Sequence, residues 1–200
     1  ILYGRMSRYE DSAKAFEGVI KIVPDSAVAI RNLATIYHYL DRTDEAASLL
    51  QRALELSPSA PLYTNLGTLR FFQARYDESI SAFNKAVELG ANSYSNWGNL
   101  ADAYRWSATQ KEKAPETYTQ AIKLTREALA KNPGDNLAKS TLAVYLAKHG
   151  DYAESLKIAD SMNSDGLKQG AVAFKLAVAF EIAGKREKAL KLIQTARKLG

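Results

Sequence analysis

Apolar residues recur along the chain with the period of an α-helix, and one pattern of small residues returns at a nearly constant interval. A Leu followed by Ala or Gly recurs at Leu33-Ala34, Leu66-Gly67, Leu100-Ala101, Leu142-Ala143 and Leu176-Ala177, with one interval longer than the others. Self-similarity at a period of about 34 residues is typical of stacked structural units. The pattern therefore predicts an all-α repeat protein.

Each unit is expected to contain two helices. A second series of small residues follows the first, at the same offset from the Leu in four repeats, at Ser12, Ala46, Ser79, Ala114, Ser155 and Ala189. Short turns such as Ala183-Gly184-Lys185 interrupt the apolar pattern between the two series. Pro24, Pro58 and Pro133 should end the second helices, because proline lacks the amide hydrogen and clashes with the preceding turn.

Small residues on facing helices let the two axes approach to about 8–10 Å. A single helix pair cannot bury its apolar face, so each pair must pack against the neighbouring pairs. We therefore expect one elongated α-solenoid over residues 1–200, with a partial repeat at 1–24 and repeats at about 25–58, 59–91, 92–133, 134–165 and 166–200. The opening Ile1-Leu2-Tyr3-Gly4 resembles no translation start, so we also expect a fragment of a longer protein.

The third unit is longer than the others. The stretch from Ala114 to Pro133 exceeds the equivalent stretches that begin at Ser12 and Ala46 and end at Pro24 and Pro58. The additional residues correspond to two helical turns, about 10 Å of helix. A protruding second helix is expected near Lys111 to Lys131.

The order of these positions resembles the tetratricopeptide repeat consensus over nearly the whole chain. One unit carries Tyr63, Leu66-Gly67, Tyr76, Ser79, Phe83 and Ala86, and the next carries Trp97, Leu100-Ala101, Tyr104, Ala114, Tyr118 and Ala121. The resemblance implies a right-handed α-α superhelix of about five helix pairs plus a partial N-terminal unit. The run from Tyr94 to Trp106 is similar to repeat regions attached to bacterial kinases, adenylate cyclases and transcription activators, which implies a bacterial regulatory parent.

The resemblance also implies that the first helices line a concave groove that binds a peptide or protein. An Asn precedes the Leu in three repeats, and an amide that both donates and accepts can pair with a peptide backbone. The alternative, that these Asn side chains tie neighbouring repeats together, remains open. The candidate groove residues, with Gly98 beside them, are Arg31, Asn32, Thr35, His38, Tyr39, Thr64, Asn65, Thr68, Phe71, Phe72, Asn99, Asp102, Arg105 and Trp106.

The residues that carry catalysis are sparse. The sequence has no Cys and two His, which excludes disulfides, thiolate catalysis and sulfur-ligated zinc. It contains no glycine-rich phosphate loop and no nucleophile elbow. His149 precedes Gly150 in a predicted turn, where a helix C-cap is the expected role. We predict no enzyme, no catalytic residues, no metal and no cofactor.

The net charge of +5 equals the charge of one end of the chain, where Glu187 is the one acidic residue among Lys185, Arg186, Lys188, Lys191, Arg197 and Lys198. No aromatic side chains interleave these charges, as stacking on bases would require, so we expect a solvated helix face and no nucleic-acid partner. Charged residues interrupt every apolar run before the roughly 18 residues of a membrane span, so no membrane association is expected. A cytoplasmic location is the default for such a chain.

The sequence therefore predicts a protein–protein interaction adaptor that holds a peptide or protein partner in a concave groove. Two alternatives remain. Exposed apolar ends of the stack would allow self-association as a homodimer. The chain would otherwise be an accessory regulatory domain of a larger bacterial signalling or transcription protein.

Overall fold

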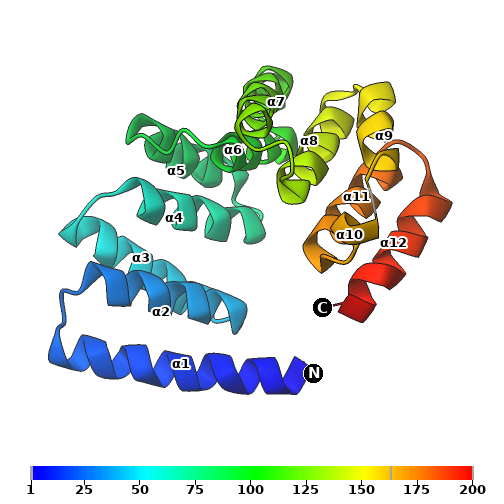
Figure 1. Ribbon diagram of the computed structural model, residues 1–200. Helices are drawn as coiled ribbons and strands as arrows, with labels where there is room; N and C mark the ends of the chain where they lie inside the picture. Colours follow the sequence, from blue (N-terminus) through cyan, green and yellow to red (C-terminus); the bar gives the residue numbers. More distant parts are fainter. Residues whose placement is uncertain (1, 163, 200) are drawn as a thin grey trace. The chain divides into compact units, whose positions relative to one another are not determined.

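All regular elements of the described residues are helices, as the apolar period predicts. The computed structural model describes residues 2–162 and 164–199, with side chains for 8–162 and 166–198. The elements in chain order are α1 (Leu2–Ile22), α2 (Ala27–Tyr39), α3 (Thr43–Leu56), α4 (Ala60–Phe72), α5 (Tyr76–Glu88), α6 (Tyr94–Trp106), the 3-10 helix η1 (Lys111–Lys113), α7 (Ala114–Lys131), α8 (Asn136–His149), α9 (Tyr152–Asp160), α10 (Ser164–Leu167), α11 (Gly170–Ile182) and α12 (Arg186–Leu199) (Figure 1). The expected all-α fold is confirmed. Within the described residues, no helix combines the length and apolar character that a bilayer span requires.

The chain divides into two compact units. Unit 1 comprises residues 1–92 and 102–111, and unit 2 comprises residues 93–101 and 112–200. Helix α6 is shared, since its first part groups with unit 2 and its last turn groups with unit 1. The expectation of a single solenoid over residues 1–200 stays a prediction.

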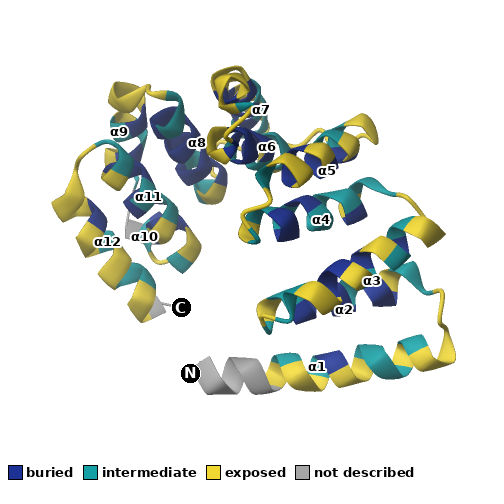
Figure 2. Ribbon diagram, turned by 180° about the vertical axis from the view of Figure 1, so that it is seen from behind, coloured by how far each residue is buried: buried dark blue, intermediate teal, exposed yellow. Residues whose placement is uncertain are grey.

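Unit 1 is built from antiparallel helix pairs that pack in sequence order. Helix α2 contacts α1 and α3, and α4 contacts α3 and α5 (Figure 1). Buried residues gather on the faces that meet, and exposed residues lie on the opposite faces (Figure 2). Ile30, Leu33, Ala46 and Leu50 are among the buried residues at the centre of this core. Burial of these apolar faces is what holds the pairs together, since each CH₂ group removed from water contributes about 0.8 kcal/mol.

The expected role of the small residues is confirmed where the two helices of a repeat meet. The Ser79 hydroxyl of α5 donates a hydrogen bond of 2.7 Å to the carbonyl of Gly67 in α4. A Cβ atom on Gly67 would lie 2.8 Å from the ring of Phe83, so no larger residue fits without movement. In unit 2 the equivalent Ser155 donates to the carbonyl of Ala143, also at 2.7 Å. A small residue at this position thus lets the helices approach closely, and a serine adds a hydrogen bond between them.

Helix α8 is the central helix of unit 2. It contacts α7, α9 and α11, and every residue from Ser140 to Ala147 is buried. A helix that is enclosed on several sides loses the one-sided apolar pattern of a surface helix. Gly98 of α6 packs against the same helix, because a Cβ atom there would lie 2.0 Å from the Tyr145 hydroxyl.

The turns and prolines end the helices where the sequence predicts. Helices α1, α3 and α7 stop just before Pro24, Pro58 and Pro133. Residues with positive φ close the turns that join the two helices of a pair, at Asp41 (60°), Ala74 (56°), Gly150 (109°) and Gly184 (74°). Two of these four left-handed positions are thus occupied by residues other than glycine, which is the residue that adopts this conformation without steric cost.

The long helix of the third unit is present, but it is shorter than expected. Helix α7 has 18 residues, against 14 in α3 and 13 in α5. It begins at Ala114 rather than near Lys111, because Pro115 occupies its first turn, where a missing amide is tolerated. The remaining additional residues form the turn from Ser107 through η1.

Candidate functional site

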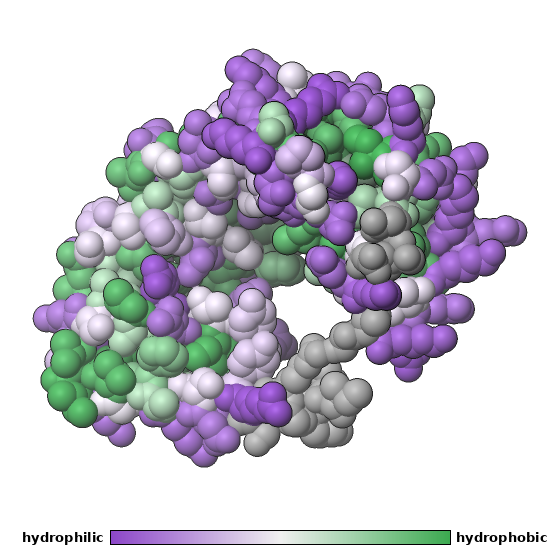
Figure 3. Space-filling view, viewed as in Figure 1, coloured by the Kyte–Doolittle hydropathy of each residue, from purple (hydrophilic) through white to green (hydrophobic). Residues whose placement is uncertain are grey.

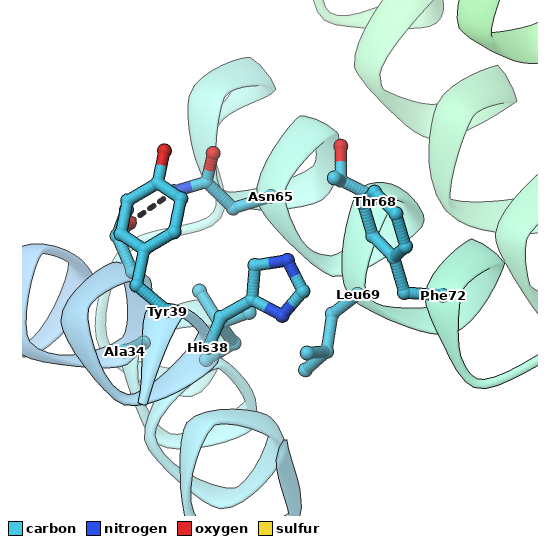
Figure 4. A pocket seen from close by; sticks show the side chains of 9 residues that line it. Ala34, His38, Tyr39, Asn65, Thr68, Leu69 and Phe72 are labelled. Atoms are coloured by element: carbon cyan, nitrogen blue, oxygen red, sulfur yellow. Dashed lines mark hydrogen bonds between the residues drawn. The ribbon is translucent and has the colours of Figure 1, made fainter. Parts of the chain in front are cut away.

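A pocket of about 300 Å³ opens between helices α2, α3 and α4 of unit 1. Figure 4 shows the ring of His38 lying between the rings of Tyr39 and Phe72, with Asn65 and Thr68 above it in this view. Helices α2 and α4 supply the walls, and α3 contributes one residue to the floor. The pocket is lined by Ala34, Thr35, His38, Tyr39, Leu50, Asn65, Thr68, Leu69 and Phe72.

Six of these nine residues are among the candidate groove residues from the sequence: Thr35, His38, Tyr39, Asn65, Thr68 and Phe72. The other three, Ala34, Leu50 and Leu69, are buried core residues that form the floor. The repeat pattern places Ala34 and Leu50 in the core. It carries no signal that a core side chain is also reached from the groove, because that depends on the gap left between neighbouring pairs.

Aromatic rings form a continuous chain of contacts through unit 1. Tyr39 and Phe72 are 59% and 67% exposed, which is unusual for side chains of this size. Both lie close to the His38 ring, with centroid distances of 5.9 and 5.1 Å. Successive neighbours within 6.3 Å are Tyr9, Tyr39, His38, Phe72, Phe71, Tyr76 and Trp106, which we call the aromatic chain.

Burial lowers the pKa of His38 below its usual 6.5, although the negative charge of Asp41 opposes the shift. Removal of water disfavours the charged imidazolium. His38 is therefore a neutral ring at physiological pH. None of the nine lining residues then carries a formal charge, so the pocket is electrically neutral.

Thr35 of α2 and Asn65 and Thr68 of α4 supply polar groups to the pocket, and we call these three side chains its polar wall. The Thr35 hydroxyl donates to the carbonyl of Arg31 at 3.1 Å, and the Thr68 hydroxyl donates to the carbonyl of Thr64 at 2.9 Å. Asn65 Nδ2 donates to Thr35 Oγ1 at 3.4 Å, from α4 across to α2. Of the two roles open for the Asn residues, a tie between repeats is thus observed for Asn65.

The remaining candidate residues lie in different surroundings. Arg31, Asn32, Thr64 and Phe71 are half-buried on α2 and α4 of unit 1. The last turn of α6 adds half-buried Asp102, exposed Arg105 and 61%-exposed Trp106 to the same unit.

Two residues of α6 fall outside that set. Asn99 is half-buried in unit 2, so the structure does not bring it together with Asn32 and Asn65 in one unit. Gly98, expected beside the groove, is instead buried against Tyr145. That expectation is wrong, because the missing side chain serves close packing with α8.

Next to Trp106, a carboxylate holds the turn that follows α6. Asp77 accepts hydrogen bonds from the hydroxyls of Ser107 at 2.7 Å and Thr109 at 3.1 Å. The bond from Ser107 is the main reason that the pKa of Asp77 is lowered. The Ser107 hydroxyl also accepts hydrogen bonds from the backbone amides of Thr109 and Gln110. The turn after α6 is thus bonded to itself and, through Asp77, to the start of α5. We assign it a structural role.

One histidine of unit 2 lies between an aspartate and a threonine, as in a hydrolase triad, but the site lacks free hydrogen-bond donors for an oxyanion. His149 Nδ1 lies 2.7 Å from Asp151 Oδ2, and Nε2 lies 3.3 Å from Thr119 Oγ1. The Thr119 hydroxyl also donates to the carbonyl of Pro115 at 3.1 Å, inside a helix whose interior amides are already bonded. A triad needs free donors beside the nucleophile to stabilise an oxyanion. The hydrogen bonds of His149 instead link α7 to the C-terminal end of α8.

Among residues with described side chains, no group of three or more His, Cys, Asp or Glu is placed to hold a metal.

The basic C-terminal end lies on α12, where hydrophilic side chains cover the surface (Figure 3). Lys188 forms an ion pair with Asp160 of α9, and its Nζ lies 5.1 Å from the ring centroid of Phe180 in α11. One of the basic side chains of α12 thus contacts the neighbouring helices α9 and α11. In the same view, hydrophobic side chains gather at the end of α1, where Ile22 and Val23 are exposed.

Sequence and structure comparisons with known proteins both find tetratricopeptide repeats. Profiles of the tetratricopeptide repeat match residues 1–61 and 116–162, and residues 60–92. A search of curated proteins found no match. The crystal structure of YrrB, described as a TPR protein with an unusual peptide-binding site, has 22% identity and a TM-score of 0.56, over 94% of this chain and 93% of that one.

Two further solved structures show the same fold at lower identity. TTC0263, a thermophilic TPR protein of Thermus thermophilus, has 17% identity and a TM-score of 0.65, over 88% of this chain and 92% of that one. Human IFIT1, described as a dimer with m7Gppp-AAAA, has 16% identity and a TM-score of 0.66, over 92% of this chain and 44% of that one. The repeat profiles, which cover more than half of the residues, and the helix-pair architecture together establish that the chain belongs to the tetratricopeptide repeat family.

Proposed function

We propose that unit 1 binds a peptide segment of another protein along α2 and α4, with the pocket between these helices as the anchoring point. The fold is that of protein–protein interaction scaffolds. The observation that carries the proposal is the pocket itself, in which six candidate groove residues meet. Exposed aromatic residues beside a partly apolar depression are typical of binding hot spots.

Other features support a surface that recognises an extended chain. Asn65 retains its carbonyl oxygen and one amide hydrogen beyond its bond to Thr35, so it can pair with a peptide bond. Tyr39 and Phe72 provide apolar area at little cost in side-chain entropy, since each has two rotatable bonds. YrrB, of the same fold, has a peptide-binding site by its description.

A peptide library displayed on phage, selected on the immobilised full chain, tests the proposal. We expect enriched peptides whose affinity falls at least tenfold with Phe72→Ala and several-fold with Asn65→Ala, because truncation of an anchor costs about 1–2 kcal/mol or more. Isothermal titration calorimetry of synthetic copies of the enriched peptides would measure both losses.

Phe174→Ala is the matched control, because Phe174 of α11 is a similarly exposed phenylalanine, at 57%, in unit 2. It should leave the affinity unchanged. Circular dichroism should show equal helicity for all variants. Failure to enrich any peptide, or equal affinity for the wild type and the Phe72→Ala variant, would contradict the proposal.

A further inference from the structure

The hydroxyl groups in the pocket wall have already donated their hydrogens. Thr35 and Thr68 each donate to the carbonyl four residues earlier in their own helix, so towards the pocket they offer lone pairs alone. Asn65 Oδ1 makes no hydrogen bond to another described residue, and it adds a further acceptor. In Figure 4 the oxygens of Asn65 and Thr68 point the same way, above the His38 ring.

Donors in the pocket are fewer than acceptors. Asn65 has one amide hydrogen left after its bond to Thr35, and neutral His38 has one N–H and one acceptor nitrogen. Tyr39, which is 59% exposed, adds a hydroxyl that can donate or accept. A ligand group that carries a hydrogen-bond donor therefore pairs with the acceptors of Thr35, Asn65 and Thr68, whereas a group with only acceptors or no polar atom leaves them unpaired.

The remaining surfaces of the pocket favour a flat apolar group. The floor consists of Ala34, Leu50 and Leu69, and the rings of Tyr39, His38 and Phe72 line the sides. A volume of about 300 Å³ lies at the lower limit of ligand pockets, about 300–1,000 Å³, and suits one large side chain. No lining residue carries a carboxylate, so a lysine or arginine anchor would lose hydration here without a counter-charge.

From these features we infer that the pocket takes a tryptophan side chain of the partner peptide, with the indole N–H bonded to the wall of Thr35, Asn65 and Thr68. This inference rests on the proposed function. Indole is the aromatic side chain whose polar atom is a donor only, so it leaves no acceptor of its own unpaired. The ring packs on the leucine floor and against the rings of Tyr39 and Phe72.

The decisive measurement compares N-acetyltryptophanamide with its N1-methyl analogue by titration into ¹⁵N-labelled protein, followed by NMR. We expect weak binding of the first probe, with amide shifts centred on His38, Asn65 and Thr68. Affinity for the N1-methyl analogue should be about fivefold lower, because one hydrogen bond is lost. N-acetylphenylalaninamide and N-acetyllysinamide should bind at least as weakly as the methylated probe.

The double variant Thr35→Val/Thr68→Val removes two acceptors and keeps the shape of the side chains. It should abolish most of the discrimination between indole and N1-methylindole. Thr195→Val is the control, because the hydroxyl of Thr195 makes the same bond, to the carbonyl of Lys191, far from the pocket in sequence. The comparison of probes on the wild type needs no variant, so it decides the inference even if the double variant does not fold.

The outcomes separate this inference from the function on which it rests. Equal binding of the methylated probe, or tighter binding of the phenylalanine or lysine probe, overturns the tryptophan anchor. If the peptides selected from the phage library depend on Phe72 but lack tryptophan, the inference fails while the proposed function stands. If no peptide binds, both fail.

Discussion

Single residues in this protein decide whether neighbouring helices can meet and turn. Gly67 and Gly98 each face an aromatic ring at a distance that no Cβ atom tolerates. Four of the residues with positive φ, Asp41, Ala74, Gly150 and Gly184, have a different role, since they reverse the chain between the helices of a pair. Two of them, Gly150 and Gly184, have nothing within 4 Å of a built Cβ atom, so a substitution there changes backbone strain and little else.

This contrast gives a prediction at the turns. Gly184→Ala should lower the free energy of unfolding by about 1 kcal/mol, because a residue with a Cβ atom is strained at φ 74°. Ala74→Gly, at φ 56° in the equivalent turn, should raise it by about 0.5 kcal/mol, since relief of strain exceeds the added entropy of the unfolded chain. Urea denaturation followed by circular dichroism would measure both. The same sign of change for the two variants would refute the explanation.

At the scale of elements, the helices are the part of the fold that the sequence predicts best. Prolines and small residues mark each helix pair, and α3 and α5 bury the residues that the pattern places inside. The third unit shows why spacing alone is insufficient. A count of additional residues cannot divide them between helix and turn, whereas Pro115 does mark the observed start of α7.

The pocket could be predicted from the sequence only in part, because its floor depends on how the helices pack. The register of the repeat identifies Thr35, His38 and Phe72 as groove candidates. It does not identify Leu50 of α3 as part of the floor, because its access from the groove depends on how closely α2 and α4 approach. The register implied by the family resemblance likewise placed Gly98 on the groove side, whereas the structure packs it against Tyr145 of another helix.

The turn after α6 gives a prediction that depends on pH. Asp77→Asn removes the charge that accepts hydrogen bonds from Ser107 and Thr109, so it should lower the urea midpoint at pH 7. The pKa of Asp77 is lower in the folded state than its usual 3.8, and its contribution is therefore present above that value and lost as pH falls through the folded pKa. The midpoints of the wild type and the variant should converge as the pH falls through the folded-state pKa of Asp77. A difference in midpoint that stays constant over the whole acidic range in which the protein remains folded would exclude the charge as its cause.

At the scale of the whole molecule, stability is expected to be local. Repeat proteins are held by contacts between neighbouring elements, so a defect weakens its own surroundings first. In unit 2, α8 is enclosed by α7, α9 and α11, and Gly98 packs against its Tyr145. In unit 1, α2 and α3 supply most of a core cluster that also contains residues of α1 and α4.

Gly98→Ala tests this locality. The new methyl group would overlap the Tyr145 ring, and overpacking of this kind costs about 1–3 kcal/mol. Hydrogen exchange followed by mass spectrometry should show faster exchange in α8 and unchanged exchange in α2 and α3. The double variant with Tyr145→Ala should lose less stability than the sum of the single variants. Uniform acceleration along the whole chain would show instead that the protein unfolds as one cooperative body.

The division of α6 between the two units has a practical consequence for spectroscopy. The sequence contains two tryptophans, and both lie on this helix, Trp97 in the part that groups with unit 2 and Trp106 in the part that groups with unit 1. Trp106 is largely exposed and should emit at longer wavelength than half-buried Trp97. Replacing either one with phenylalanine leaves a single tryptophan, so selective excitation of that indole over the 11 tyrosines follows the melting of each half without any attached label.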